Sequence, residues 1–190
     1  TRLFDGMDVG LELSAAQVWT QCHSYAFDYS VWEIWGALLH GGRLVVVPEQ
    51  VASSPEDLHA LLIAEHVTVL SQTPSALAML SPEGLESVAL RAAGEACPAD
   101  VVDRWAPGRV MINGYGPTET VTFACTYDIP VLDAGARSVP IGRPIGNTQV
   151  YVLDAMQRPV PFGAVGEICI GGAGVARGYL GRPELSAARL

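Results

Sequence analysis

The 190 residues are 49% hydrophobic and 16% charged, which allows one domain with a sizeable core and excludes an intrinsically disordered chain. The formal net charge at pH 7 is −9 and no run of basic residues occurs, so non-specific nucleic-acid binding is not expected. No apolar run reaches the roughly 18 residues of a membrane-spanning helix, and the first residues do not resemble a signal peptide. We therefore expect a cytoplasmic chain without membrane association.

The cysteines and the basic residues support two further expectations. Four scattered cysteines without a Cys-x-x-Cys pair predict free thiols rather than a metal site or a disulfide framework. All eleven basic residues are arginine, so the chain holds no lysine. Because the chain does not begin with Met, we expect a segment excised from a longer protein.

Strands and helices are expected to alternate over the first two thirds of the chain. The expected strands lie at residues 18–22, 43–48, 67–70, 88–93 and 110–112. The expected helices begin at Ser30, Ser54, Pro74 and Pro98. This alternation predicts an α/β fold, a parallel sheet with right-handed crossovers and flanking helices. Ligands bind such sheets at the carboxyl ends of the strands, so one crevice is expected to gather Asp28, Ser71, Gly94 and Tyr115.

Two patterns in this region make definite local predictions. Ser30, with Glu33 three residues later, forms a capping box and predicts that a helix starts there. That helix is expected to carry one apolar face made of Val31, Ile34, Trp35, Leu38 and Leu39. The uninterrupted apolar run within residues 43–48 predicts a strand buried on both faces.

The pattern changes after Thr122, and the boundary between two subdomains is expected near residues 130 to 140. Strands are expected at residues 149–153 and 167–170, separated by turns, and short strands divided by turns predict an antiparallel sheet. The glycine run at 171–178 does not keep the spacing of a dinucleotide-binding loop, so a structural turn between strands is expected there. We therefore expect an α/β subdomain over residues 1–135 and a smaller β-rich subdomain over 136–190, incomplete at its C-terminus, where a last helix begins.

The stretch 110–120 has the most specific pattern. Its apolar start ends in Asn-Gly-Tyr-Gly-Pro, which is turn chemistry, and Thr118 and Glu119 follow. Glycines let backbone N–H groups approach an anion, a threonine hydroxyl can donate to phosphate, and a carboxylate can hold Mg²⁺. The alternative is an ordinary strand exit in which Thr118 and Glu119 cap the next element.

Three segments resemble motifs of adenylate-forming enzymes, and most closely those of the adenylation domains of nonribosomal peptide synthetases. Residues 113–119 resemble Asn-x-Tyr-Gly-Pro-Thr-Glu, and residues 27–33 resemble Phe-Asp-x-Ser-x-Trp-Glu. Residues 166–180 resemble Gly-Glu-Leu-x-Ile-x-Gly-x-Gly-x-Ala-Arg-Gly-Tyr-Leu. The motifs keep the family's order, and the resemblance covers nearly the whole chain. It implies part of the large N-terminal domain of such an enzyme, with residues 1–135 binding substrate and adenine.

The resemblance implies that Asp28 binds the α-amine of an amino-acid substrate. A carboxylate beside aromatic side chains is costly to bury unless it meets a cation, and the substrate supplies one in its ammonium group. The alternative is that Asp28 caps the helix expected to begin at Ser30.

Other positions receive roles from the same resemblance. The substrate side-chain pocket would be lined by Tyr29, Trp32, Ser71, Arg91, Ala93, Gly114, Gly116, Thr122 and Phe123. Adenine would be held by Gly94, Glu95, Ala96, Asn113, Gly114 and Tyr115. Thr118 would contact the α-phosphate and Glu119 would bind Mg²⁺, which makes these two the implied catalytic residues. Each pocket position could instead be plain core, and Trp32 most of all.

Arg91 is a lone arginine in an apolar strand, and its direction leaves two alternatives open. If it faces the pocket, its guanidinium would suit a substrate with an acidic or strongly hydrogen-bonding side chain. If it faces outward, it carries no information about the substrate.

A parent enzyme of this family would activate an amino acid with ATP to aminoacyl-AMP and load it onto the phosphopantetheine thiol of a carrier protein. The implied cofactors are ATP and Mg²⁺. The implied partners are the amino acid, a peptidyl carrier protein and neighbouring synthetase domains. A small MbtH-like accessory protein is compatible with this reading, although no stretch indicates one.

The sequence lacks the family's phosphate loop, its ribose-binding aspartate and the C-terminal domain that carries a catalytic lysine. We therefore expect the isolated chain to adenylate poorly or not at all. One alternative is an acyl- or aryl-acid ligase of the same superfamily, which would give no reason to bury Asp28. The other is a non-catalytic scaffold domain, which nucleotide binding would argue against.

Overall fold

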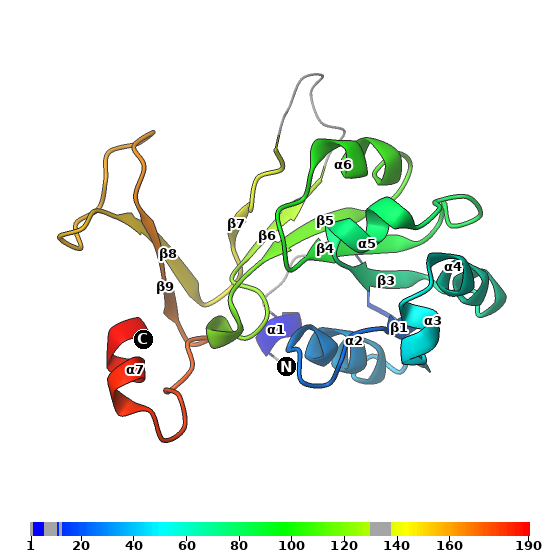
Figure 1. The fold of residues 1–190 in the computed structure, drawn as a ribbon, viewed down its shortest axis with the longest axis horizontal. Coiled ribbons are helices and arrows are strands. Elements are labelled where there is room, and N and C mark those ends of the chain that lie inside the picture. Colours follow the sequence, from blue (N-terminus) through cyan, green and yellow to red (C-terminus); the bar gives the residue numbers. More distant parts are fainter. Residues whose placement is uncertain (1, 6–10, 12, 130–137) are drawn as a thin grey trace.

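A seven-stranded sheet forms the centre of the molecule, with strand order β2-β1-β3-β4-β5-β6-β7 (Figure 1). The computed structural model describes residues 2–5, 11, 13–129 and 138–190. Strands β1 to β5 pair in parallel, whereas β6 and β7 pair antiparallel at one side, and the predicted α/β fold is confirmed. The bounds are Val18–Gln21 (β1), Arg43–Val46 (β2), Val69–Gln72 (β3), Ala89–Ala93 (β4), Met111–Tyr115 (β5), Cys125–Asp128 (β6) and Arg143–Pro144 (β7).

Helices cover both faces of this sheet and close a core on each. Leu62, Leu77 and Trp105, from three helices, belong to the core on one face, while Leu3 and Trp32 belong to the core on the other. The helices of the first face are α4 (Pro55–Ala64), α5 (Pro74–Met79) and α6 (Ala99–Trp105). Those of the second are α1 (Arg2–Asp5) and α2 (Tyr29–Leu38), and short turns form α3 (Glu49–Ala52) and the 3₁₀-helix η1 (Thr118–Thr120).

Helix α4 begins as its sequence predicts. Ser54 is the N-cap, Pro55 takes the first helical position, and the Ser54 hydroxyl accepts the backbone N–H of Asp57 at 3.4 Å. The strand predicted at 88–93 is also confirmed, because β4 is buried along its whole length.

The capping box predicted at Ser30 and Glu33 is wrong. The N-cap of α2 is Asp28, two residues before Ser30, and the Ser30 hydroxyl donates to the carbonyl of Phe27 at 2.8 Å. Glu33 is fully buried and accepts the backbone N–H groups of Cys22 at 3.1 Å and His23 at 3.2 Å. A tertiary contact to the loop after β1 therefore takes the carboxylate that the local pattern assigned to the helix start.

The apolar face predicted for α2 is also wrong. Val31, Trp35 and Leu38 are 40%, 48% and 52% exposed, and the helix buries the side that carries Trp32 and Gly36 instead. A β-carbon at Gly36 would collide with the ring of Trp19 on β1, so the helix approaches the sheet at its glycine. Close approach of the backbone, rather than apolar periodicity, sets the orientation of α2.

Two smaller expectations about strands need correction. Strand β2 lies at the edge of the sheet, and Val46 is exposed, so the run at 43–48 is not buried on both faces. Ser71 lies inside β3 rather than in the loop after it. Strand order, which places β2 at an edge and exposes Val46, is not encoded in the apolar run itself.

A separate two-stranded antiparallel sheet follows, as predicted, from β8 (Thr148–Leu153) and β9 (Glu167–Gly172). The last helix, α7 (Pro183–Arg189), packs beside it in Figure 1. The glycine run turns after β9 and leads to α7, so within the described residues no further strand follows it. The predicted subdomain boundary between residues 135 and 136 lies outside the described residues and stays a prediction. Strand β7, beyond that boundary, pairs with β6 of the large sheet.

All four cysteines are free, as predicted. Across residues 2–5, 11, 13–129 and 138–190, none of the helices has the length and apolar character that crossing a membrane requires.

Candidate functional site

Two joined cavities lie at the carboxyl ends of β4 and β5. The first, here the Asp28 cavity, has a volume of about 160 Å³ and is lined by Phe27, Asp28, Tyr29, Ala93, Gly94, Gly114, Gly116, Pro117, Thr118, Thr122 and Phe123. The second, here the Tyr115 cavity, has about 370 Å³ and is lined by Gly94, Glu95, Ala96, Cys97, Asn113, Gly114, Tyr115, Gly116, Pro117, Val139 and Ile141. Gly94, Gly114, Gly116 and Pro117 belong to both walls, so the cavities meet there.

Asp28 lines the first cavity, and one of its carboxylate oxygens is buried without a hydrogen-bond donor among the described residues. Its Oδ2 is inaccessible to solvent and accepts no hydrogen bond from the described residues. Asp28 occupies the N-cap position of α2, as the capping alternative expected, but its side chain makes no capping hydrogen bond. An uncompensated buried carboxylate is costly. The arrangement is suited to a cationic ligand group in the cavity.

Aromatic side chains form part of the wall of the Asp28 cavity. Tyr29 and Phe123 meet edge to face with ring centroids 5.5 Å apart, and the His23 ring stacks on Tyr29 with centroids 4.6 Å apart. The Tyr29 hydroxyl donates to the backbone carbonyl of Arg91 at 2.8 Å, and burial raises the pKa of the phenol, which keeps it neutral. Gly114 allows this packing, because a β-carbon there would lie 2.8 Å from the Phe123 ring.

Three predicted pocket residues, Trp32, Ser71 and Arg91, line neither cavity. Arg91 is 2% exposed, with its guanidinium carbon 4.2 Å from the Trp32 ring centroid and 4.4 Å from that of Phe123. The indole Nε1 of Trp32 donates to the Ser71 hydroxyl at 3.1 Å. Burial lowers the pKa of Arg91 to about 10, which leaves it charged at neutral pH. These side chains pack against one another and against Phe123, and their predicted contact with a substrate stays a prediction.

The Tyr115 cavity gathers every residue that was predicted to hold adenine. Its glycine-rich wall exposes backbone groups, and Gly94 takes a φ of +92° where the chain leaves β4. The Asn113 amide donates to the carbonyl of Pro140 at 2.8 Å, which holds the loop before β7 over the cavity. Glu95 is fixed by the Ser75 backbone N–H at 2.9 Å and the Ser75 hydroxyl at 2.8 Å, and these hydrogen bonds lower the pKa of Glu95.

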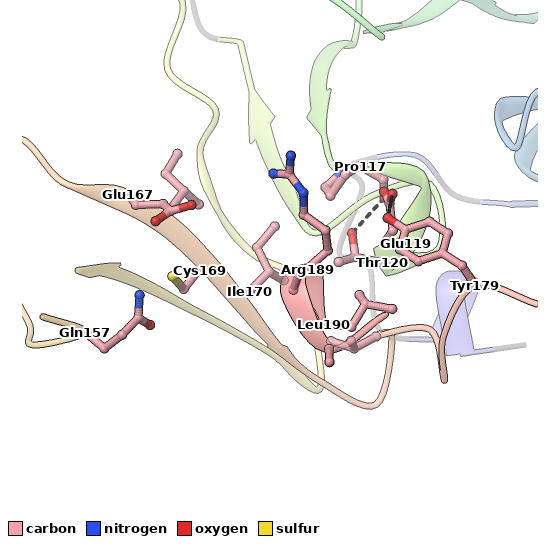
Figure 2. Close-up of a pocket in the computed structure, with 14 residues that line it drawn as sticks. Pro117, Glu119, Thr120, Gln157, Glu167, Cys169, Ile170, Tyr179, Arg189 and Leu190 are labelled. Carbon is pink, nitrogen blue, oxygen red and sulfur yellow. Dashed lines mark hydrogen bonds between the residues drawn. The ribbon is translucent and has the colours of Figure 1, made fainter. Parts of the chain in front are cut away.

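The chain after β5 places Thr118 and Glu119 in different cavities. Thr118 lines the Asp28 cavity, whereas Glu119 lines a third cavity of about 640 Å³ between η1, β9 and α7 (Figure 2). Pro117 borders all three cavities. Val121 and Thr122 follow with φ values of 63° and 68°, which is rare for β-branched residues and directs Thr122 and Phe123 back to the first cavity. The Thr122 hydroxyl donates to the backbone carbonyl of Asp28 at 3.1 Å.

Tyr179 contacts Glu119 and is a residue that the sequence analysis did not single out. Its hydroxyl donates a hydrogen bond to Glu119 Oε1, drawn as a dashed line in Figure 2. This bond lowers the pKa of Glu119 and raises that of Tyr179. The backbone N–H of Ala176 also donates to the Glu119 carbonyl at 2.7 Å. The only sequence signal for this contact is that Tyr179 falls within the motif at 166–180.

The residues at Glu119 fit a magnesium ion held partly by a ligand. No three His, Cys, Asp or Glu side chains of the described chain gather as a metal cluster. Mg²⁺ is commonly held by one or two carboxylates together with phosphate groups of a ligand, so a single carboxylate at the edge of a cavity would suit it.

Comparisons with known proteins agree with this geometry. Residues 2–180 match the sequence pattern of the family described as AMP-binding enzyme. The chain is 61% identical over 189 residues to the isonitrile lipopeptide synthase of Mycobacterium tuberculosis (strain ATCC 25618 / H37Rv), covering 100% of this chain and 7% of that protein. It is 44% identical over 204 residues to a dimodular nonribosomal peptide synthase of Bacillus subtilis (strain 168), covering 100% and 9%. The chain thus spans less than a tenth of the length of these two curated relatives.

Solved structures share the fold. FmoA3, a nonribosomal peptide synthetase in its AMPPNP-bound form, superposes with a TM-score of 0.92 at 29% identity, covering 98% of this chain and 21% of that chain. Holo-PA1221, which contains adenylation and carrier-protein domains bound to a vinylsulfonamide inhibitor, gives 0.89 at 30% identity, covering 99% and 34%. Holo-AB3403, a four-domain nonribosomal peptide synthetase bound to AMP and glycine, gives 0.84 at 34% identity, covering 93% and 13%.

Proposed function

Because the chain belongs to the AMP-binding enzyme family, we propose that it is the amino-acid-selecting and adenine-binding part of a nonribosomal peptide synthetase adenylation domain. In the intact protein, a carboxylate oxygen of the amino acid attacks the α-phosphorus of ATP, and pyrophosphate leaves. The phosphopantetheine thiol of a carrier protein then attacks the aminoacyl carbonyl and AMP leaves. The carrier-protein step is supported by relatives in which adenylation and carrier domains share one protein.

The observation that carries this proposal is the buried, unpartnered Oδ2 of Asp28. An α-ammonium group in the Asp28 cavity would supply the missing donor and the compensating charge, and a hydrogen bond to an ionised partner is stronger than one between neutral groups. Acids without an amine would leave this oxygen unpaired. The preference for an amino acid over a simple acyl or aryl acid follows from that difference.

The junction of the cavities would bring the two substrates together. Adenine in the Tyr115 cavity would stack on Tyr115 and meet backbone groups of the glycine-rich wall. Thr118, which lines the neighbouring Asp28 cavity, would then donate to the α-phosphate. The amino-acid carboxylate would reach the phosphorus near Gly116, since that residue borders both cavities.

Glu119 would hold Mg²⁺ on the third cavity side of η1, and Tyr179 would fix the carboxylate there. The metal, when bound, neutralises charge that develops on the phosphate oxygens. The need for an MbtH-like protein, and the cytoplasmic location, stay predictions.

Binding tests this proposal better than turnover, because a chain without lysine is expected to adenylate poorly on its own. We would titrate the chain with alanyl sulfamoyl-adenosine, a non-hydrolysable aminoacyl-AMP mimic, and with its analogue lacking the amine, by calorimetry. Asp28→Asn should weaken the binding of the amine-bearing mimic at least about tenfold, because a hydrogen bond to a charged group contributes roughly 1.5–3 kcal/mol. The same substitution should barely change the binding of the amine-free analogue.

Asp100→Asn provides the matched control, because Asp100 is an exposed aspartate on α6 that lines none of the three cavities. Tighter binding of the amine-free analogue by the unmodified chain would favour an acyl- or aryl-acid ligase. Failure to bind either mimic or AMP would favour a non-catalytic scaffold.

A further inference from the structure

Glu33 and His23 form a buried pair that the proposed function does not use. Neither residue lines any of the three cavities. The Glu33 side chain is 0% exposed and that of His23 is 11% exposed, and Nδ1 of His23 lies 2.9 Å from Oε1 of Glu33. Because a fully buried carboxylate is costly, the groups that compensate it identify what it holds in place.

Glu33 holds the start of the loop that joins β1 to α2. Its Oε1 accepts the backbone N–H of Cys22 at 3.1 Å, and its Oε2 accepts that of His23 at 3.2 Å. Both oxygens thus act as acceptors, as those of a carboxylate do, so Nδ1 of His23 is the third donor and carries a proton. Burial, with the neighbouring Glu33 charge, raises the pKa of the Cys22 thiol to about 12, so the thiol stays neutral.

The His23 ring connects this pair to the wall of the Asp28 cavity. It stacks on Tyr29 with ring centroids 4.6 Å apart, and it meets Phe27 edge to face with centroids 5.5 Å apart. Phe27, Asp28 and Tyr29 are consecutive residues, and all three line the cavity. A continuous series of contacts therefore runs from Glu33 through His23 to the cavity wall.

Asp28 ends the loop that begins at Cys22, and its side chain is not fixed by a hydrogen bond at the helix start. It makes no capping hydrogen bond, and its Oδ2 accepts none from the described residues. The backbone carbonyl of Asp28 accepts the Thr122 hydroxyl at 3.1 Å, which anchors this end of the loop. Glu33 anchors the other end. The direction of the Asp28 carboxylate therefore depends on both anchors.

We propose that Glu33 and His23 are positioning residues for the amino-acid substrate. They hold the loop that carries Phe27 and Asp28, so that the Asp28 carboxylate meets the α-ammonium group. This proposal rests on the proposed function, because it concerns how the same site binds its substrate. Neither residue touches the substrate. Glu33 acts through the His23 ring and the loop backbone, and a purely structural role, in which the pair only stabilises the fold, is the alternative.

Two substitutions test the positioning role. Glu33→Gln keeps the shape of the side chain but replaces one acceptor oxygen by an amide that donates, whereas His23→Phe keeps a ring and removes Nδ1. Each variant would be titrated by calorimetry with alanyl sulfamoyl-adenosine and with its amine-free analogue, after circular dichroism shows that it is folded. Heteronuclear NMR of the unmodified chain would show which nitrogen of the His23 ring carries the proton.

Glu65→Gln and His40→Phe are the matched controls. Glu65 accepts a hydrogen bond from Arg43 Nη1 at 2.6 Å on the surface, and Nδ1 of His40 donates to the Gly36 carbonyl at 3.0 Å. Neither residue lines any of the three cavities. Both control variants should bind the two ligands as the unmodified chain does.

Positioning predicts that Glu33→Gln and His23→Phe each weaken the alanyl mimic at least about fivefold relative to the amine-free analogue. The reason is that a misaligned hydrogen bond to an ionised group keeps only part of its strength. In the unmodified chain the His23 proton should lie on Nδ1.

Unchanged relative binding in either folded variant would overturn the positioning role, whatever the loss of stability, and would leave the proposed function intact. A His23 ring protonated on Nε2 alone would also overturn it. If Glu33→Gln does not fold, His23→Phe decides alone. An unmodified chain that binds the amine-free analogue as tightly as the alanyl mimic would overturn both proposals.

Discussion

The seven-stranded sheet and the two-stranded sheet differ in how they are packed. Buried hydrophobic residues lie on both faces of the large sheet, and Ile145 is the last of them along the described chain. From β8 onward, large apolar side chains such as Phe162 and Val165 are exposed instead. The Asp28 and Tyr115 cavities are built on the packed sheet, whereas the cavity at Glu119 takes one wall from β9 and α7.

The two halves of the proposed site are therefore held in place by different interactions. The part that would select the amino acid and adenine is fixed by a core on both sides of the sheet. The part that would hold the metal depends on a few polar contacts, chiefly those of Glu119 with Tyr179 and Ala176. Experiments that compare the two regions can therefore test whether core packing holds the first half and polar contacts hold the second.

Hydrogen exchange should show the largest contrast. The amide of Leu90, bonded to the Val110 carbonyl at 2.9 Å in the large sheet, should exchange only on global unfolding. The amide of Val160, bonded to the Val152 carbonyl at 3.0 Å beside β8, should exchange far faster, because a two-stranded sheet is marginally stable in water. Equal protection of the two amides, measured by NMR, would show that both sheets unfold as one unit.

Truncation of one large side chain in each region should separate them next. Trp105→Ala removes a fully buried ring whose Nε1 donates to the Leu77 carbonyl at 2.9 Å, and it should lower the free energy of unfolding by about 3–5 kcal/mol. Phe162→Ala should leave it unchanged, because the ring contacts solvent on all sides. Urea denaturation followed by circular dichroism measures both, and a comparable loss in the two variants would contradict the comparison.

Removing the Tyr179 hydroxyl should weaken the junction between the regions without changing the large sheet. Tyr179→Phe leaves the ring and deletes the hydrogen bond to Glu119. The amide of Ala176, which donates to the Glu119 carbonyl, should then exchange faster, while that of Leu90 should not change. Tyr151→Phe is the control, since Tyr151 is a half-exposed residue of β8. Unchanged exchange at Ala176 in Tyr179→Phe would mean that the hydroxyl does not hold this junction.

A change of pH near neutrality should have the smallest effect, because the hydrogen bond between Tyr179 and Glu119 should not respond to it. The pKa of Glu119 is lowered by the bond from Tyr179, so its stabilising contribution is present above the ordinary glutamate pKa and is lost as the pH falls through the lowered value. The pKa of Tyr179 is raised by Glu119, so its contribution is lost only as the pH rises through that raised value. NMR of the Tyr179 ring should show no change between about pH 5 and 9. A transition within that range would contradict the bond.

The sequence predicts the α/β fold well because its strongest signals are local. Ser54 and Pro55 start α4 as their chemistry requires, and the apolar run at 88–93 forms a buried central strand. The orientation of α2 could not be predicted from its pattern, because it depends on how closely Gly36 approaches Trp19. Likewise, the edge position of β2 follows from strand order, which a run of valines does not encode.

The candidate site was predictable in part for a similar reason. Residues that share a motif, such as Gly114 and Tyr115, are brought to the cavities by the strand that carries them. Contacts between distant segments were not predictable, and the 60-residue separation between Glu119 and Tyr179 is one case. The burial of Arg91 against Trp32 and Phe123 is another, since periodicity gives a side chain's face but not the neighbours that it meets.

The most direct test of the account is a crystal structure of the chain with alanyl sulfamoyl-adenosine. We expect the α-ammonium nitrogen at about 2.7–3.2 Å from Asp28 Oδ2, a normal hydrogen-bond distance, with adenine beside Tyr115 in the Tyr115 cavity. An ammonium group that points to solvent, with Asp28 Oδ2 still buried and unpartnered, would contradict it.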